Sequence, residues 1–95
     1  MKFIFSGTML RFVDYSHEVE ISEPNFELAL KGLLAKAPAL EGVLLDSNKN
    51  LRRTHQMFLN GESMEARYYS DAQARNALAV QPTDSVYFLT AIAGG

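Results

Sequence analysis

The sequence contains no cysteine, and this absence excludes disulfide bonds, thiolate metal sites and cysteine nucleophiles. It also lacks a long hydrophobic run, because no stretch approaches the roughly 18 apolar residues that a membrane span requires. The apolar start at Met1–Gly7 is too short for a signal peptide. Neither sign of charge dominates, since the net charge is −2, and there is no basic stripe of the kind that binds nucleic acid. We therefore expect a cytoplasmic protein with no nucleic-acid or membrane partner.

Histidine is scarce as well, because only His17 and His55 occur. They fall on separate expected strands, a pattern more typical of surface residues than of metal ligands. An acidic stretch lacks the spacing of a calcium loop and is typical of a solvated face: Glu18, Glu20, Glu23 and Glu27. The sequence predicts neither a metal site nor a catalytic residue.

The composition is that of an ordinary globular protein. Apolar residues make up 47% of the 95 residues and charged residues 21%, which excludes a disordered or fibrous chain. This length can bury one core but not two. We expect one domain that spans residues 1–95.

The first half of the chain predicts two strands and a helix. Lys2–Ser6 is a short apolar-rich run closed by Gly7, and His17–Ile21 alternates polar and apolar residues as a half-buried strand does. Ser22 is a suitable N-cap for a helix over about Pro24–Ala37. An apolar stripe at helical spacing supports this helix: Phe26, Leu30, Leu33, Leu34 and Ala37. Pro38 ends it.

The second half is less regular. Ala39–Leu51 contains Gly42 and a turn-rich stretch, so it is predicted to be a long loop with Leu40, Val43 and Leu44 pointing inward. His55–Leu59 is typical of a strand, and Asn60-Gly61 is a strong tight-turn signal after it. Asp71–Leu78 predicts a short helix capped by Asp71. A turn at Pro82–Asp84 leads into a last strand over Val86–Ile92. This order predicts an α+β fold with one main helix on a mixed sheet.

The sequence ends on Ala93-Gly94-Gly95, directly after the last expected strand. Neither glycine carries a Cβ, so residues 92–95 can form a flexible tail that enters a narrow channel. An α-carboxyl group has a pKa of about 3.3–3.7 and is ionised at neutral pH. A carboxylate at Gly95, native or exposed by processing, can attack a phosphoryl centre. Small residues are also common at frayed chain ends.

Three short segments carry a resemblance to a known family. Phe58–Glu62, the turn at Pro82–Val86 and the Ala-Gly-Gly end resemble the MoaD/ThiS family of bacterial sulfur-carrier proteins, which have the ubiquitin-like β-grasp fold. Leu44–Asp46 and Leu51–Arg53 are most similar to the branch that serves cysteine or siderophore thiocarboxylate biosynthesis. The resemblance implies one main helix on a four- to five-stranded mixed sheet.

The resemblance also implies a function. The Gly95 carboxylate would be adenylated by an E1-like enzyme and converted to a thiocarboxylate that donates sulfur in biosynthesis of the cysteine, methionine, siderophore, molybdopterin or thiamine type. The chain itself would bind no cofactor, because ATP and Mg²⁺ would be used by the activating partner. Further partners would be a sulfur-accepting synthase or a sulfurtransferase, and a metalloprotease. The protein would be a carrier and a substrate rather than an enzyme.

The β-grasp pattern also predicts which residues face inward. The expected core is Phe3, Phe5, Val19, Ile21, Phe26, Leu30, Leu33, Met57, Leu59, Val86 and Phe88. Four residues would then form a docking surface beside the tail: Phe58, Tyr87, Leu89 and Ile92. Alternatively, the loop Gly42–Arg53 covers one or two of them. Arg52 and Arg53 could meet acidic partner residues or remain plain solvated charges.

Two other classes of function stay open. A protein modifier would use the same activation and then form an isopeptide bond between Gly95 and lysines of target proteins. A β-grasp interaction module would have no tail chemistry, and Gly94 and Gly95 would be incidental. Removal of these glycines would leave the function of such a module intact.

Overall fold

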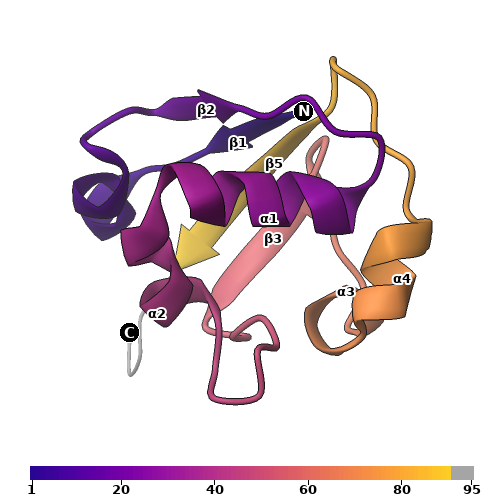
Figure 1. The fold of residues 1–95 in the computed structure, drawn as a ribbon. Helices are drawn as coiled ribbons and strands as arrows, with labels where there is room; N and C mark the ends of the chain where they lie inside the picture. Colours follow the sequence, from indigo (N-terminus) through magenta and orange to yellow (C-terminus); the bar gives the residue numbers. More distant parts are fainter. Residues whose placement is uncertain (91–95) are drawn as a thin grey trace.

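The computed structural model describes residues 1–90, which form an α+β unit built on one five-stranded sheet (Figure 1). The strands are β1 (Lys2–Ile4), β2 (Glu18–Glu20), β3 (His55–Leu59), β4 (Glu62–Ser63) and β5 (Ser85–Thr90). Their order across the sheet is β2-β1-β5-β3-β4. β1 and β5 are parallel, and the other neighbouring pairs are antiparallel. The predicted α+β class with a mixed sheet of four to five strands is confirmed.

The main helix α1 (Phe26–Lys36) lies across one face of the sheet (Figure 1). Three shorter α-helices accompany it, together with two 3₁₀ helices, so the described residues contain more helix than the one main helix that the sequence predicts. The short α-helices are α2 (Glu41–Leu44), α3 (Arg67–Ser70) and α4 (Ala72–Ala77). The 3₁₀ helices are η1 (Gly7–Val13), which connects β1 to β2, and η2 (Pro38–Leu40).

The predicted start of the main helix is wrong. Asn25, rather than Ser22, is the N-cap, and its side-chain oxygen accepts a hydrogen bond from the Leu28 amide at 2.9 Å. The preceding segment is held extended by long-range contacts. Asn25 forms a β-bridge with Ala79, and the Pro24 carbonyl accepts a hydrogen bond from the Val80 amide at 3.1 Å. Pairing with a segment more than 50 residues away therefore delays the helix.

The predicted long loop over Ala39–Leu51 is also corrected, because it contains α2. Gly42 favours a break in the sequence pattern, yet Leu40 and Leu44 are four residues apart and are both buried. A helical turn places such residues on one side, and burial of both side chains outweighs the glycine. The expected inward direction of Leu40 and Leu44 is confirmed, whereas Val43 is half-buried.

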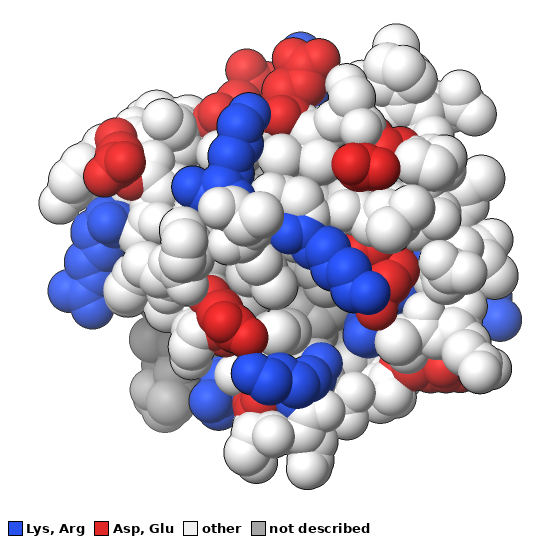
Figure 2. Space-filling model, in the orientation of Figure 1, with Lys and Arg blue, Asp and Glu red and all other residues white. Residues whose placement is uncertain are grey.

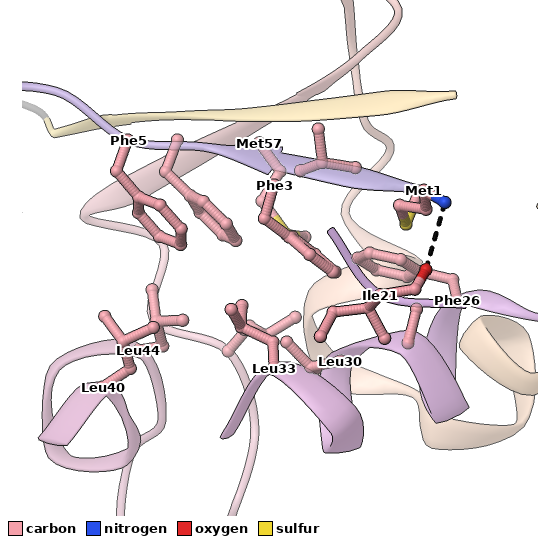
Figure 3. Close-up of a cluster of buried hydrophobic side chains, with 14 of the residues drawn as sticks. Met1, Phe3, Phe5, Ile21, Phe26, Leu30, Leu33, Leu40, Leu44 and Met57 are labelled. Carbon is pink, nitrogen blue, oxygen red and sulfur yellow. Dashed lines mark hydrogen bonds between the residues drawn. The ribbon is translucent and has the colours of Figure 1, made fainter. Parts of the chain in front are cut away.

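The core lies between the sheet and the helices. In Figure 3 the side chains of Met1, Phe3, Phe5 and Met57 face those of Leu30, Leu33, Leu40 and Leu44. Phe88 of β5 stacks on Phe3 and Phe5, with ring centroids 6.1 and 5.5 Å apart. Nine of the eleven predicted core residues are buried; Val19 and Leu59 are half-buried and pack against the others.

Met1 closes the same core. Its side chain is buried, and its amino group donates a hydrogen bond to the Ile21 carbonyl at 3.1 Å, drawn as a dashed line in Figure 3. The Ile21 amide donates in return to the Met1 carbonyl at 2.9 Å. These bonds extend the β1–β2 pairing by one residue.

The other short elements agree with the sequence. β3 begins at His55 and ends at Leu59 as predicted, and the left-handed φ of Asn60 and Gly61 fits the expected tight turn. Asp71 caps α4 by accepting a hydrogen bond from the Gln73 amide at 2.9 Å. The last strand is described as far as Thr90, so its predicted end at Ile92 lies outside the described residues.

The surface mixes both signs of charge. Figure 2, in the orientation of Figure 1, shows acidic and basic side chains interspersed over the helical side. Within residues 1–90, no helix has the length and apolar character needed to cross a membrane.

Candidate functional site

Strand alternation places one set of apolar side chains on the sheet face opposite the helices. Val86 and Phe88 of β5 point into the core, so Tyr87 and Leu89 point to the other face. Tyr87 pairs in register with Phe58 of β3 on one side and with Ile4 of β1 on the other. Partners in register share a face of the sheet. We call Ile4, Phe58, Tyr87 and Leu89 the outer patch.

The outer patch is separate from the core. Leu89 is 45% exposed, and Ile4, Phe58 and Tyr87 are half-buried without belonging to the group of partly buried side chains that pack on the core. The Tyr87 hydroxyl lies 2.8 Å from Ser6 Oγ, which holds the ring over the sheet. The expected outward direction of Phe58, Tyr87 and Leu89 is therefore present in the structure, while their docking role stays a prediction.

Two further points compare the patch with the sequence-based expectation. Ile4 was missed, although the alternation of Phe3, Ile4 and Phe5 already placed it on the outer face. In the loop Gly42–Arg53, Leu44, Leu45 and Leu51 are buried in the core cluster, and Leu89 of the patch stays exposed. Cover of Phe58 or Tyr87 by this loop stays a prediction.

The end of β5 lies beside the start of β3. Thr90 pairs in register with His55, and Thr90 Oγ1 lies 3.2 Å from His55 Nδ1. Burial lowers the pKa of the His55 imidazole below its ordinary value. A hydrogen bond with the Val43 carbonyl raises that pKa and the nearby Arg52 guanidinium lowers it, both by less than burial does. The contact between His55 and Thr90 links the last described residue of β5 to β3.

The opposite end of β5 is fixed by a polar cluster. The Asn60 side chain donates a hydrogen bond to Asp84 Oδ1 at 2.9 Å and accepts one from the Ser85 amide at 2.9 Å. Asp84 Oδ2 accepts a hydrogen bond from the Gln81 amide at 2.7 Å. The hydrogen bond from Asn60 lowers the pKa of the Asp84 carboxyl group, and the Gln81 amide lowers it further. Both ends of β5 are thus anchored to β3 or to the hairpin beyond it.

The described residues offer little for catalysis or metal binding. Between Met1 and Thr90, no group of three or more metal-ligating side chains comes together. A hollow of about 460 Å³ lies between η1, β2 and the end of α1. Its lining combines apolar side chains such as Phe12 and Val19 with charged ones such as Glu20 and Lys36.

The predicted tail residues fall beyond this description. Ile92, Ala93, Gly94 and Gly95 lie outside residues 1–90, and so does the Ile92 contribution to the predicted docking surface. The last described residue is Thr90, which follows Leu89 of the outer patch in the sequence and pairs in register with His55.

Comparison with known proteins identifies the fold. No protein-family model matches the sequence, and no curated protein matches it. The structure is similar to SAMP1 from Haloferax volcanii, with a TM-score of 0.73 and 18% identity over 99% of this chain and 97% of that one.

Two further similar structures involve CysO. A chain of the Amycolatopsis orientalis BexX/CysO complex matches with a TM-score of 0.75 and 16% identity, over 99% of this chain and 98% of that chain. Mycobacterium tuberculosis CysO, described as an antigen, matches with a TM-score of 0.72 and 20% identity, over 96% and 98%. At these identities the likeness establishes the fold, and the chain therefore has the ubiquitin-like β-grasp fold.

Proposed function

We propose that the protein is a sulfur carrier whose Gly95 carboxylate is adenylated by an E1-like enzyme and then converted to a thiocarboxylate. The observation that carries the proposal is the β-grasp fold over nearly the whole chain, joined to the sequence Ala93-Gly94-Gly95 five residues or fewer after β5. The similarity to CysO and SAMP1 supports it, as does the sequence resemblance to MoaD/ThiS proteins.

The chemistry follows from the properties of a carboxylate. A Gly95 carboxylate oxygen would attack the α-phosphorus of ATP, and the bond from that phosphorus to the bridging oxygen would break with pyrophosphate leaving. The product is a mixed anhydride between the carboxyl group and AMP. Hydrosulfide would then attack the carbonyl carbon, AMP would leave, and loss of the sulfur-bound proton would give the Gly95 thiocarboxylate. A persulfide donor would instead give an acyl disulfide, and a thiol would have to reduce its S–S bond to release the thiocarboxylate.

The activating partner must supply the catalytic groups. Attack by a carboxylate on a triphosphate brings anions together, and Mg²⁺ and cationic side chains offset this repulsion. Among residues 1–90, no group of three or more His, Asp or Glu side chains comes together that could hold Mg²⁺. We therefore assign ATP and Mg²⁺ to the partner and the role of substrate to this chain.

The outer patch is suited to dock that partner. Leu89 is exposed and stands next to Thr90, so a protein that covers the patch also meets the start of residues 91–95. These five residues span at most about 17 Å when extended. A partner seated on Phe58, Tyr87 and Leu89 would therefore need its active site within that distance of Thr90 to meet the Gly95 carboxylate.

The test of the carrier function is an intact-mass measurement. The protein would be incubated with ATP, Mg²⁺, an E1-like enzyme and sulfide, with Gly95-deleted protein as the matched control. We expect the full chain to gain the mass of one sulfur-for-oxygen exchange and the control to stay unchanged. Conversion of neither protein, or of both, would contradict the proposal.

A separate pair of variants tests the docking role. Leu89 is 45% exposed on the outer patch, and Leu28 is 38% exposed on α1. Leu89→Asp should weaken binding to the E1-like enzyme about 10-fold or more, since apolar anchors dominate such interfaces. Leu28→Asp changes the same side chain on the helical side and should leave binding unchanged. Equal effects would show that the patch is not the docking surface.

A second candidate function is protein modification. SAMP1 is named a small archaeal modifier protein, and a modifier would use the same activation of Gly95. Denaturing electrophoresis of cell extract distinguishes the two, because a modifier accumulates in higher-mass conjugates with lysines of other proteins. A carrier remains at its own mass.

A further inference from the structure

One stretch of the chain carries positive charge without any negative charge. Residues 47–61 contain Lys49, Arg52 and Arg53 and neither Asp nor Glu, in a chain whose net charge is −2. The register of the sheet places part of this stretch at one particular site. Because His55 pairs with Thr90, Arg53 and Arg52 lie two and three residues before the β3 residue that adjoins the end of β5.

The backbone around these arginines is fixed. The Arg52 amide donates a hydrogen bond to the Leu44 carbonyl at 2.7 Å. The preceding residue, Leu51, is buried, and its amide donates to the Tyr69 carbonyl at 2.8 Å. The Arg53 guanidinium lies over the Tyr69 ring, 4.7 Å from its centroid. Both arginines are exposed, so two positive charges are presented from an ordered segment.

Two acidic residues, Glu41 and Asp46, line the same hollow as Arg52. The Asp46 carboxylate accepts hydrogen bonds from the Asn48 and Asn50 amides at 2.8 and 3.1 Å. Among residues 1–90 the four ion pairs do not involve Arg52 or Arg53. Glu41, on neighbouring α2, binds Lys49 at 2.9 Å. Asp84 lies before the opposite end of β5, held by Asn60. Asp84 is therefore separated from the two arginines by the length of β5, and it lies near Lys2, which pairs in register with Ser85.

We propose that Arg52 and Arg53 form a cationic docking site for an acidic surface of the protein that receives residues 91–95. The identity of that protein as an activating enzyme rests on the proposed function; the acidic character of its surface does not. Opposite charges steer two proteins together and fix their relative orientation. The outer patch supplies apolar contact beside the same strand end, and the two arginines set the direction of approach.

An acidic protein surface fits this site better than nucleic acid does. Binding to nucleic acid uses a basic stripe that neutralises many phosphates, whereas in the described part of the chain two exposed arginines, Arg52 and Arg53, precede His55. A short run of carboxylates on a protein matches two guanidinium groups, which bind carboxylates through paired hydrogen bonds.

The first test uses a hexaglutamate peptide as a probe and the ¹⁵N-labelled full chain. We expect the amide chemical shifts to change most at Arg52, Arg53, Thr54 and Thr90, and these changes should saturate as peptide is added. They should be lost in the double variant Arg52→Gln and Arg53→Gln. A hexathymidine oligonucleotide should bind more weakly than the peptide. Shift changes spread evenly over all cationic residues, or tighter binding of the oligonucleotide, would overturn the proposal.

A matched control separates local charge from total charge. The double variant Lys31→Gln and Arg67→Gln also removes two exposed positive charges, and Arg67, like Arg53, lies over a tyrosine ring. These residues are on α1 and α3. This variant should bind the peptide as the unchanged protein does. Equal loss in both double variants would show that only net charge matters.

The second test measures association with the E1-like enzyme. The Arg52 and Arg53 double variant should associate about 3- to 10-fold more slowly at low salt. That difference should shrink to less than about 2-fold at 0.5 M salt, where the Debye length is about 4 Å. Normal association of the variant with an enzyme that adenylates the chain would refute the docking site and keep the proposed function. Peptide binding at Arg52 without adenylation of the chain by any such enzyme would keep the docking site and refute the proposed function.

Discussion

Replacement of Phe88 by alanine tests the strand register that creates the outer patch. Phe88 is 1% exposed, stacks on Phe3 and Phe5, and pairs with Met57 in register. Truncation of a buried phenylalanine costs about 3–5 kcal/mol, and loss of two aromatic pairs favours the upper half of that range. A 95-residue protein has a free energy of unfolding of about 5–14 kcal/mol, so the variant should lose a large share of it.

Urea denaturation followed by circular dichroism measures this loss. With a slope of about 1–2 kcal/mol per molar urea, the midpoint of Phe88→Ala should fall by about 2–5 M. The neighbouring variant Leu89→Ala is the control, and it should change the free energy of unfolding by less than about 1 kcal/mol because Leu89 is 45% exposed. A small loss for Phe88→Ala with a large loss for Leu89→Ala would mean that β5 faces the other way, and the outer patch would not exist.

Three more variants probe single contacts by urea denaturation. Gly32→Ala should destabilise the fold by about 1–2 kcal/mol despite its better helix propensity, because the added Cβ would lie 2.8 Å from Ile21 Cγ2; a gain in stability would contradict this close approach. Arg75→Met should cost about 2–3 kcal/mol, because it leaves the half-buried Glu27 carboxylate without its partner at 2.8 Å; a neutral result would show that the pair adds nothing. The lowered pKa of His55 means that unfolding takes up a proton, so stability should fall as the pH drops through about 6.5. His55→Asn should flatten that decline, and an unchanged pH profile would exclude His55 as its source.

The sequence patterns predicted those secondary-structure elements whose bounds depend on neighbouring residues. The short run His55–Leu59 and the Asn60-Gly61 turn that follows it predicted the bounds of β3 correctly, since turn geometry is a property of adjacent residues. The main helix was located from its apolar stripe. Its start was not, because the bridge between Asn25 and Ala79 is a tertiary contact that no neighbouring residue indicates.

Burial of charge was likewise invisible in the sequence. Arg75 is 3% exposed, and its guanidinium binds Glu27 from 48 residues away as well as the carbonyl groups of Tyr68 and Tyr69. The sequence indicated the residues of the basic site but not its location in the fold. The Arg52-Arg53 pair stands out in the sequence, but its place at the end of β5 depends on the pairing of His55 with Thr90.

The exchange of labelled pyrophosphate into ATP tests the central claim most directly. With an E1-like enzyme and Mg²⁺, the full chain should support exchange, because attack by the Gly95 carboxylate on the α-phosphorus is reversible. Deletion of Gly95 moves the carboxylate by about 3.5 Å, far beyond the placement that in-line attack tolerates. We predict that the deleted protein keeps its urea midpoint and supports no exchange. Exchange at the normal rate with the Gly95-deleted protein would contradict the assignment of this chain as a carrier activated at Gly95.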